Sequence, residues 1–120
     1  MDRTIVIVDD NSAHLGILFE FLNKERVGTV HCFTDPAKAQ AFAKTTRIDV
    51  LITDYSMPEM NGIELIDALP GIPAMFLISC SLPENEQLRK ECAKRGVFAL
   101  DKISLLTALA EKPRRTGHGT

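Results

Sequence analysis

The feature that most constrains the fold of this chain is the alternation of short apolar runs with longer amphipathic stretches. Thr4–Val8 is a continuous, mostly β-branched run, typical of a strand that is buried on both faces. The stretch after it places Leu15, Leu18, Phe19 and Leu22 three or four positions apart, as in a helix with one buried face. The same strand-then-helix order recurs along the chain. It predicts an α/β fold in which a parallel sheet carries helices on both faces.

The later elements are predicted from the same periodicity and from local start and stop signals. Asp35 followed by Pro36 is a typical helix start, and Gly96 is a typical helix end. We therefore expect one domain over residues 1–110, followed by a polar tail or the start of a linker at 111–120. The further strands are expected at 27–33, 48–53, 74–78 and 97–100. One helix is expected to begin at Asp35–Pro36, and two others to cover 63–69 and 83–95. A last helix, capped by Ser104, is expected to run to about Ala110.

Composition excludes several classes of protein. The 120 residues are 45% hydrophobic, which is enough for a core, and the net charge of −2 argues against binding nucleic acid through bulk electrostatics. No apolar run reaches the ~18 residues of a membrane span, and the first residues do not resemble a secretory signal. The three widely spaced cysteines form neither a disulfide framework nor a CxxC zinc motif. We expect a cytoplasmic protein that does not bind membranes.

Polar and charged residues follow four of the five predicted strands. Asp9 and Asp10 come after the first, Asp54 after the third, Ser79 after the fourth and Lys102 after the fifth. The carboxyl ends of parallel strands meet at one edge of a sheet, where ligands bind in such folds. Each pair of carboxylates about 5 Å apart repels by roughly 3 kcal/mol at an effective dielectric constant of 20. Such a cluster either retains a proton or holds a cation, and carboxylate oxygens open to water suit Mg²⁺.

The other groups at this edge indicate phosphoryl chemistry. Lys102 beside a small hydroxyl, Ser79, can hold a phosphoryl group, and a carboxylate such as Asp54 can form an aspartyl-phosphate. Simpler interpretations stay open for each residue. Asp9 and Asp10 could be an ordinary polar loop, Lys102 a solvated strand end, and Ser79 a capping hydroxyl for the next helix.

At these residues the sequence resembles the receiver domain of two-component response regulators. The segments that carry the resemblance are Ile-Val-Asp-Asp-Asn at 7–11 and Asp-Tyr-Ser-Met-Pro-Glu-Met-Asn-Gly at 54–62. The second segment fits the Asp-x-x-Met-Pro-x-Met-x-Gly loop of that family at every fixed position. The resemblance extends from Thr4 to about Ala110. It implies a flavodoxin-like (βα)5 fold, a doubly wound parallel sheet of five strands in the order 2-1-3-4-5.

The resemblance also implies a role for each residue at the strand ends. Asp54 would accept a phosphoryl group from a histidine kinase or a phosphotransfer protein. Lys102 would pair with the phosphoryl oxygens, and Ser79 would be the switch hydroxyl. Mg²⁺ would be bound directly by Asp10 and mostly through water by Asp9. The full set of implied metal ligands is Asp9, Asp10, Asp54 and the main-chain carbonyl of Ser56.

The fifth strand departs from the family pattern. Ile103 stands where the family usually has proline, and Ala99 stands where it usually has tyrosine or phenylalanine. Counted from Ser79 instead of Lys102, however, Phe98 falls at the aromatic position. A bulge near this strand would reconcile the two counts and make Phe98 the switch aromatic residue.

The resulting functional prediction is a phosphorylation-dependent switch. Phosphorylation would alter the face of the fourth and fifth helices and so change binding to a downstream partner or a tethered output domain. Such a chain is not an enzyme beyond its own phosphoryl uptake and hydrolysis, and we expect no direct nucleic-acid binding. One alternative is a degenerate receiver that acts as an interaction module without phosphate. A less favoured alternative is a Mg²⁺-dependent aspartyl-phosphate phosphohydrolase, because Ser56 occupies the position where such enzymes need a second acid.

Overall fold

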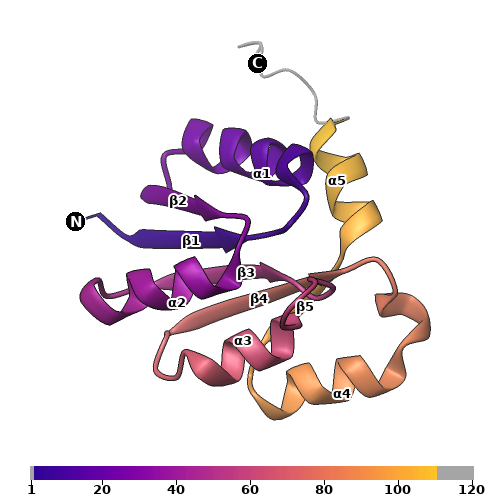
Figure 1. Cartoon of the computed structure of the whole chain (residues 1–120). Coiled ribbons are helices and arrows are strands. Elements are labelled where there is room, and N and C mark those ends of the chain that lie inside the picture. The colour runs from indigo at the N-terminus through magenta and orange to yellow at the C-terminus, as the bar shows by residue number, and fades with distance from the viewer. Residues whose placement is uncertain (1, 111–120) are drawn as a thin grey trace.

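The computed structural model describes residues 2–110, so the tail or linker predicted at 111–120 lies outside the described residues. Five parallel strands form one sheet in the order β2-β1-β3-β4-β5, which confirms the predicted fold (Figure 1). The strands are β1 Thr4–Val8, β2 Thr29–Phe33, β3 Val50–Asp54, β4 Ala74–Ser79 and β5 Phe98–Asp101. The helices are α1 Ser12–Lys24, α2 Pro36–Thr45, α3 Gly62–Ala68, the short 3₁₀ helix η1 Leu82–Glu84, α4 Glu86–Lys94 and α5 Lys102–Ala110.

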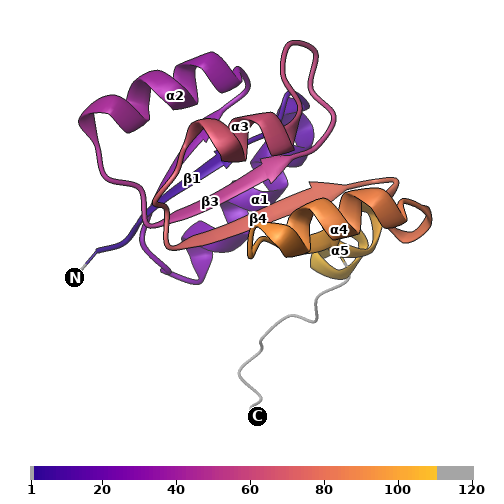
Figure 2. The same cartoon turned by 90° about the horizontal axis from the view of Figure 1, so that it is seen from below.

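The helices form two layers that enclose the sheet. Helices α1 and α5 lie on one face, and α2, α3 and α4 lie on the other (Figures 1 and 2). Val6, Leu51 and Leu77 point into the layer of α2, α3 and α4, whereas Ile7 and Ile78 point into the layer of α1 and α5. Both faces of the central strands are therefore buried. This explains why these strands appear in the sequence as continuous apolar runs.

The helix predicted at 83–95 is two separate elements. The 3₁₀ helix η1 ends at Glu84, and α4 begins only at Glu86. The reason is Asn85, whose side chain accepts a hydrogen bond from the backbone N–H of Leu88 at 2.9 Å and so caps a new helix. Gly96, with φ of 69°, ends α4 as predicted.

Arg95, at the end of α4, joins this helix to α3. Its guanidinium makes two hydrogen bonds to the carboxylate of Asp67 in α3, at 2.7 and 2.9 Å. It also donates to the carboxylate and to the backbone carbonyl of Glu91 in α4, at 2.7 and 2.9 Å. These contacts lower the pKa of both carboxyl groups. The C-terminal ends of the two helices are thus held together by one fork-shaped side chain.

The prediction that Ser104 caps the last helix is wrong. Helix α5 begins at Lys102, and the carboxylate of Asp101 accepts a hydrogen bond from the backbone N–H of Ser104 at 3.0 Å. Asp101 is therefore the cap, and Ser104 lies in the first turn. Because Asp101 is also the last residue of β5, no loop separates the strand from the helix.

No bulge of the kind that would reconcile the two counts interrupts the pairing of β4 with β5. The pairing of β4 with β5 is continuous from Phe76 and Phe98 to Ser79 and Asp101. Phe98 stacks on Phe76, with ring centroids 5.1 Å apart, and is 59% exposed, while Ala99 packs against the core on the side of α2, α3 and α4. Neighbouring residues in a strand face opposite sides of the sheet. Phe98 therefore does not reach the position of Ala99 through a shift in register.

Gly62 provides a test of how closely α3 approaches the end of β3. A methyl group at Gly62 would lie 2.5 Å from the backbone oxygen of Asp54, whereas one at Gly16 in α1 would meet nothing within 4 Å. We expect Gly62→Ala to lower the free energy of unfolding by about 1–3 kcal/mol. Gly16→Ala should instead raise it by up to about 1 kcal/mol, because alanine favours a helix. Urea unfolding measures both, and a Gly62→Ala variant as stable as the wild type would refute the close approach.

Candidate functional site

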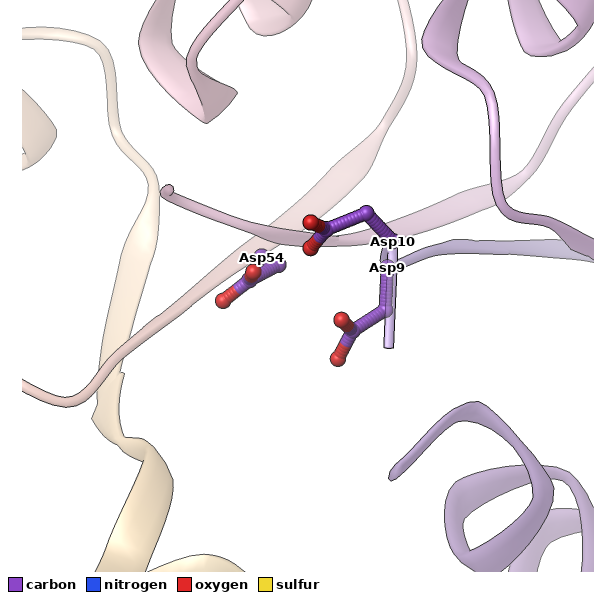
Figure 3. A group of neighbouring side chains, drawn as sticks. All are labelled: Asp9, Asp10 and Asp54. Carbon is purple, nitrogen blue, oxygen red and sulfur yellow. The ribbon is translucent and has the colours of Figure 1, made fainter. Parts of the chain in front are cut away.

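Three carboxylates meet at the carboxyl edge of the sheet. Asp9 and Asp10 follow β1, and Asp54 is the last residue of the neighbouring strand β3 (Figure 3). One oxygen atom from each carboxylate lies within 4.8 Å of those of the other two. Asp9 is 1% exposed and Asp54 is 6% exposed, whereas Asp10 is open to solvent. The predicted clustering of these three residues is confirmed.

Lys102 enters the cluster from the first turn of α5. Its Nζ atom lies 2.9 Å from Oδ2 of Asp9 and 3.2 Å from Oδ1 of Asp54. Lys102 is itself buried, so it is not a solvated strand end. The other oxygen of Asp9 accepts a hydrogen bond from the backbone N–H of Asn11 at 2.9 Å. Among residues 2–110, the carboxylate of Asp10 has no hydrogen bond or ion pair, so its oxygens are available to a ligand.

Burial and neighbouring charges shift the pKa values of Asp54 and Lys102. Burial, followed by the charge of Asp9, raises the pKa of Asp54 above its ordinary value, although Lys102 acts in the opposite direction. Burial lowers the pKa of Lys102, but its ion pairs with Asp9 and Asp54 outweigh burial and raise that pKa overall. One ammonium group faces three carboxylates, so the cluster carries excess negative charge. A cation bound there would relieve it.

Ser79 lies at the same edge, buried at the end of β4. Its hydroxyl oxygen is 3.1 Å from that of Ser81 and accepts a hydrogen bond from the backbone N–H of Ser81 at 3.2 Å. The cap of α4 is Asn85, so the interpretation of Ser79 as the capping hydroxyl of that helix is wrong. Ser79 instead fixes the start of the loop that leads from β4 to η1.

The loop after Asp54 is anchored at both ends. The backbone N–H of Tyr55 donates to the carbonyl of Ile78 at 2.9 Å, and that of Gly62 donates to the carbonyl of Tyr55 at 2.8 Å. Asn61 caps α3 in a reciprocal arrangement with Glu64. Ser56, the predicted carbonyl ligand, follows Tyr55 at the start of this loop and is exposed.

One residue that supports the site was missed in the sequence. Thr53 is fully buried, and its hydroxyl donates a hydrogen bond to the backbone carbonyl of Asp54 at 2.9 Å. Thr53 stands in an apolar run, so the sequence pattern indicates only a buried strand residue and not a hydrogen-bond donor. The available signal was a hydroxyl residue inside a strand that is buried on both faces, because a buried hydroxyl needs a partner.

Residues 5–109 match the response regulator receiver domain family, and the chain belongs to this family. It is therefore a receiver domain of two-component signalling, a class of phosphorylation-dependent switches. Among residues 2–110, no helix is both long enough and apolar enough to cross a membrane.

Several response regulators contain a similar domain as one part of a longer chain. The putative two-component response regulator ARR13 of Arabidopsis thaliana is 42% identical over 99 residues, covering 77% of this chain and 17% of that protein. The cyclic di-GMP phosphodiesterase response regulator RpfG of Xanthomonas campestris pv. campestris is 30% identical over 98 residues, covering 78% of this chain and 26% of that protein. The chain thus spans about a quarter or less of the length of these relatives.

Solved structures share the fold. The chemotaxis protein CheY4 of Vibrio cholerae aligns with a TM-score of 0.74 and 21% identity, covering 92% of this chain and 98% of that one. The isolated REC domain of RcsB from Salmonella enterica serovar Typhimurium, in the presence of phosphomimetic BeF3⁻, aligns with a TM-score of 0.73 and 20% identity. That alignment covers 92% of this chain and 85% of that one.

The raised pKa of Asp54 predicts a stability difference that depends on pH. Between the ordinary value of 3.8 and the raised value, the folded state binds a proton that the unfolded state releases, so stability falls as pH rises through this interval. We expect Asp54→Asn to be more stable than the wild type at pH 7 and to lose this advantage as pH falls to 3.8. Urea unfolding across pH measures the difference.

Asp10→Asn is the matched comparison, because it also removes one carboxylate from the cluster. The charge of Asp10 is the weakest of the influences on the pKa of Asp54, and Asp10 is exposed. Its removal should therefore give a smaller gain in stability. A wild type as stable as Asp54→Asn at pH 7 would contradict the electrostatic account of the cluster.

Proposed function

We propose that Asp54 of this receiver domain accepts a phosphoryl group from a histidine kinase or a phosphotransfer protein. The observation that carries the proposal is the position of Asp54, a buried carboxylate at the end of a central strand with Lys102 at 3.2 Å and two further carboxylates beside it. An oxygen of Asp54 forms a bond to phosphorus as the bond between phosphorus and the donor breaks. The chain then acts only on itself, through phosphoryl uptake and later hydrolysis.

Lys102 and Ser79 are proposed to hold the transferred group. The Nζ atom of Lys102 is already fixed beside Asp54 by its ion pair with Asp9, so it can donate to a phosphoryl oxygen with little reorganisation. The hydroxyl of Ser79 lies at the end of the next strand and can turn from Ser81 toward a phosphoryl oxygen. This turn would alter the start of the loop that leads to α4.

The acidic cluster is proposed to bind Mg²⁺. Its donors are all oxygen atoms, which is the ligand chemistry that Mg²⁺ prefers. Asp10 would bind directly, Asp9 mostly through water, and Asp54 and the main-chain carbonyl of Ser56 would complete the protein ligands. When bound, the ion would offset the negative charge that the phosphoryl group brings into the cluster.

The consequence of phosphorylation is proposed to be a change in binding at the face of α4, β5 and α5. The partner would be a downstream protein or a tethered output domain. The size of the relatives supports the second option, because this chain matches only a part of each. Phe98, at the start of β5, and Ile103, in the first turn of α5, expose apolar side chains that a partner can bury.

One observation favours a second candidate function. Ala99 faces the side of α4 but is too small to act as a switch side chain, and Phe98 lies on the opposite side of the sheet. A receiver with this strand could serve as an interaction module that does not respond to phosphate. The two candidates differ in whether BeF3⁻ with Mg²⁺ perturbs residues on α4 and β5.

The identity of the phosphoacceptor is tested by incubation with acetyl phosphate and Mg²⁺. We expect the wild type to gain a single phosphoryl adduct by mass spectrometry and Asp54→Asn to gain none, because the amide is a poor nucleophile. Asp35→Asn is the control, since Asp35 follows β2, which β1 separates from β3, and asparagine also serves as a helix cap. An adduct of similar yield in Asp54→Asn would show that another residue is phosphorylated.

The two aspartates after β1 should contribute unequally to metal binding. Asp9 is engaged by Lys102 and Asn11, whereas the carboxylate of Asp10 has no partner in the described part of the chain. Asp10→Ala should therefore weaken Mg²⁺ binding about tenfold or more beyond the loss in Asp9→Ala. Tyr55 is the one tyrosine of a chain without tryptophan and stands next to Asp54, so its fluorescence reports the titration. Equal losses in the two variants would refute the distinction.

A further inference from the structure

An apolar cavity lies between the sheet and the layer of α1 and α5. Its volume is about 270 Å³, and its walls come from Ile5 and Ile52 of the sheet, Leu18 of α1, and Leu105 and Leu109 of α5. The phosphorylation centre at the carboxyl edge contributes none of the lining residues. The cavity is therefore separate from the site described above.

One charged residue lines this cavity. Arg3 precedes β1, its side chain is exposed, and the other lining residues are all apolar. Within residues 2–110, no hydrogen bond or ion pair engages the guanidinium of Arg3. The wall is almost entirely apolar, so Arg3 lines it with its hydrocarbon stem while its guanidinium stays in solvent. From there the guanidinium can pair with one anionic group of a ligand whose apolar body fills the cavity.

The size of the cavity limits that ligand. An apolar cavity of about 150 Å³ stays dry and binds benzene, so a space of about 270 Å³ suits an apolar group of roughly eight to ten carbons. We propose that this cavity binds a small apolar monocarboxylate, with its hydrocarbon part between α1, α5 and the sheet and its carboxylate on Arg3. Because Leu105 and Leu109 form one wall, such a ligand contacts α5 directly.

The probes are octanoate and octanol, which share a chain length and differ in charge. We expect octanoate to cause saturable chemical-shift changes at the amides of Ile5, Ile52 and Leu105 in the wild-type protein. Octanol should bind more weakly. Arg3→Gln should weaken octanoate binding about fivefold and leave octanol binding unchanged, because it removes only the ion pair.

Two further variants control this experiment. Lys24→Gln removes a positive charge from the end of α1 without touching the cavity and should leave octanoate affinity unchanged. Val50→Phe places a larger side chain in the lining and should abolish binding of both probes. If Val50→Phe does not fold, the comparison of Arg3→Gln with Lys24→Gln decides the question alone.

Three results would overturn the proposal. They are the absence of saturable shifts at the lining residues, octanol binding as tightly as octanoate, and unchanged octanoate affinity in Arg3→Gln. Shifts confined to the exposed Phe98 and Ile103 would count as the first of these. The experiment needs neither Mg²⁺ nor a phosphodonor, so its failure would leave the proposed role of Asp54 unaffected.

Discussion

The buried ion pairs of Lys102 with Asp9 and Asp54 are the interaction on which the carboxyl edge of this sheet depends. Three carboxylates within 4.8 Å of one another repel, and two of them are almost fully removed from water. Without the ammonium group, each buried carboxylate would be an uncompensated charge, which is strongly destabilising. Lys102 thus allows the acidic cluster to exist in the folded chain while leaving the exposed Asp10 free for a cation.

The order of the strands explains how residues so far apart in the sequence meet. Strands β1 and β3 are neighbours at the centre of the sheet, so Asp9 and Asp54 end side by side. Strands β4 and β5 follow in order, which brings Ser79 and Lys102 to the same edge. The helices on both faces bury the strands that carry these residues and hold their ends in register. The site therefore depends on the order of the strands as well as on the residues that follow them.

The sequence predicted most of this architecture because buried parallel strands leave a strong apolar signal and a consistent set of polar ends. Asp9, Asp10 and Asp54 could be placed together from the topology alone. The sequence could not predict which of two nearby residues caps a helix. Asp101 and Ser104 are both good caps, and only the geometry of the strand end selects Asp101. The face occupied by Phe98 was also ambiguous, since a single inserted residue reverses every side chain after it.

The direct junction between β5 and α5 has a mechanical consequence. A loop between two elements absorbs displacement, because its backbone can change without moving the second element. Here Asp101 ends the strand and caps the helix, and Lys102 belongs to the first turn. The residue that touches Asp54 is therefore part of a helix that carries Leu105 and Leu109 on the same face, three and seven positions further on. A backbone movement at the acidic edge therefore tilts α5, because no loop lies between β5 and α5 to absorb it.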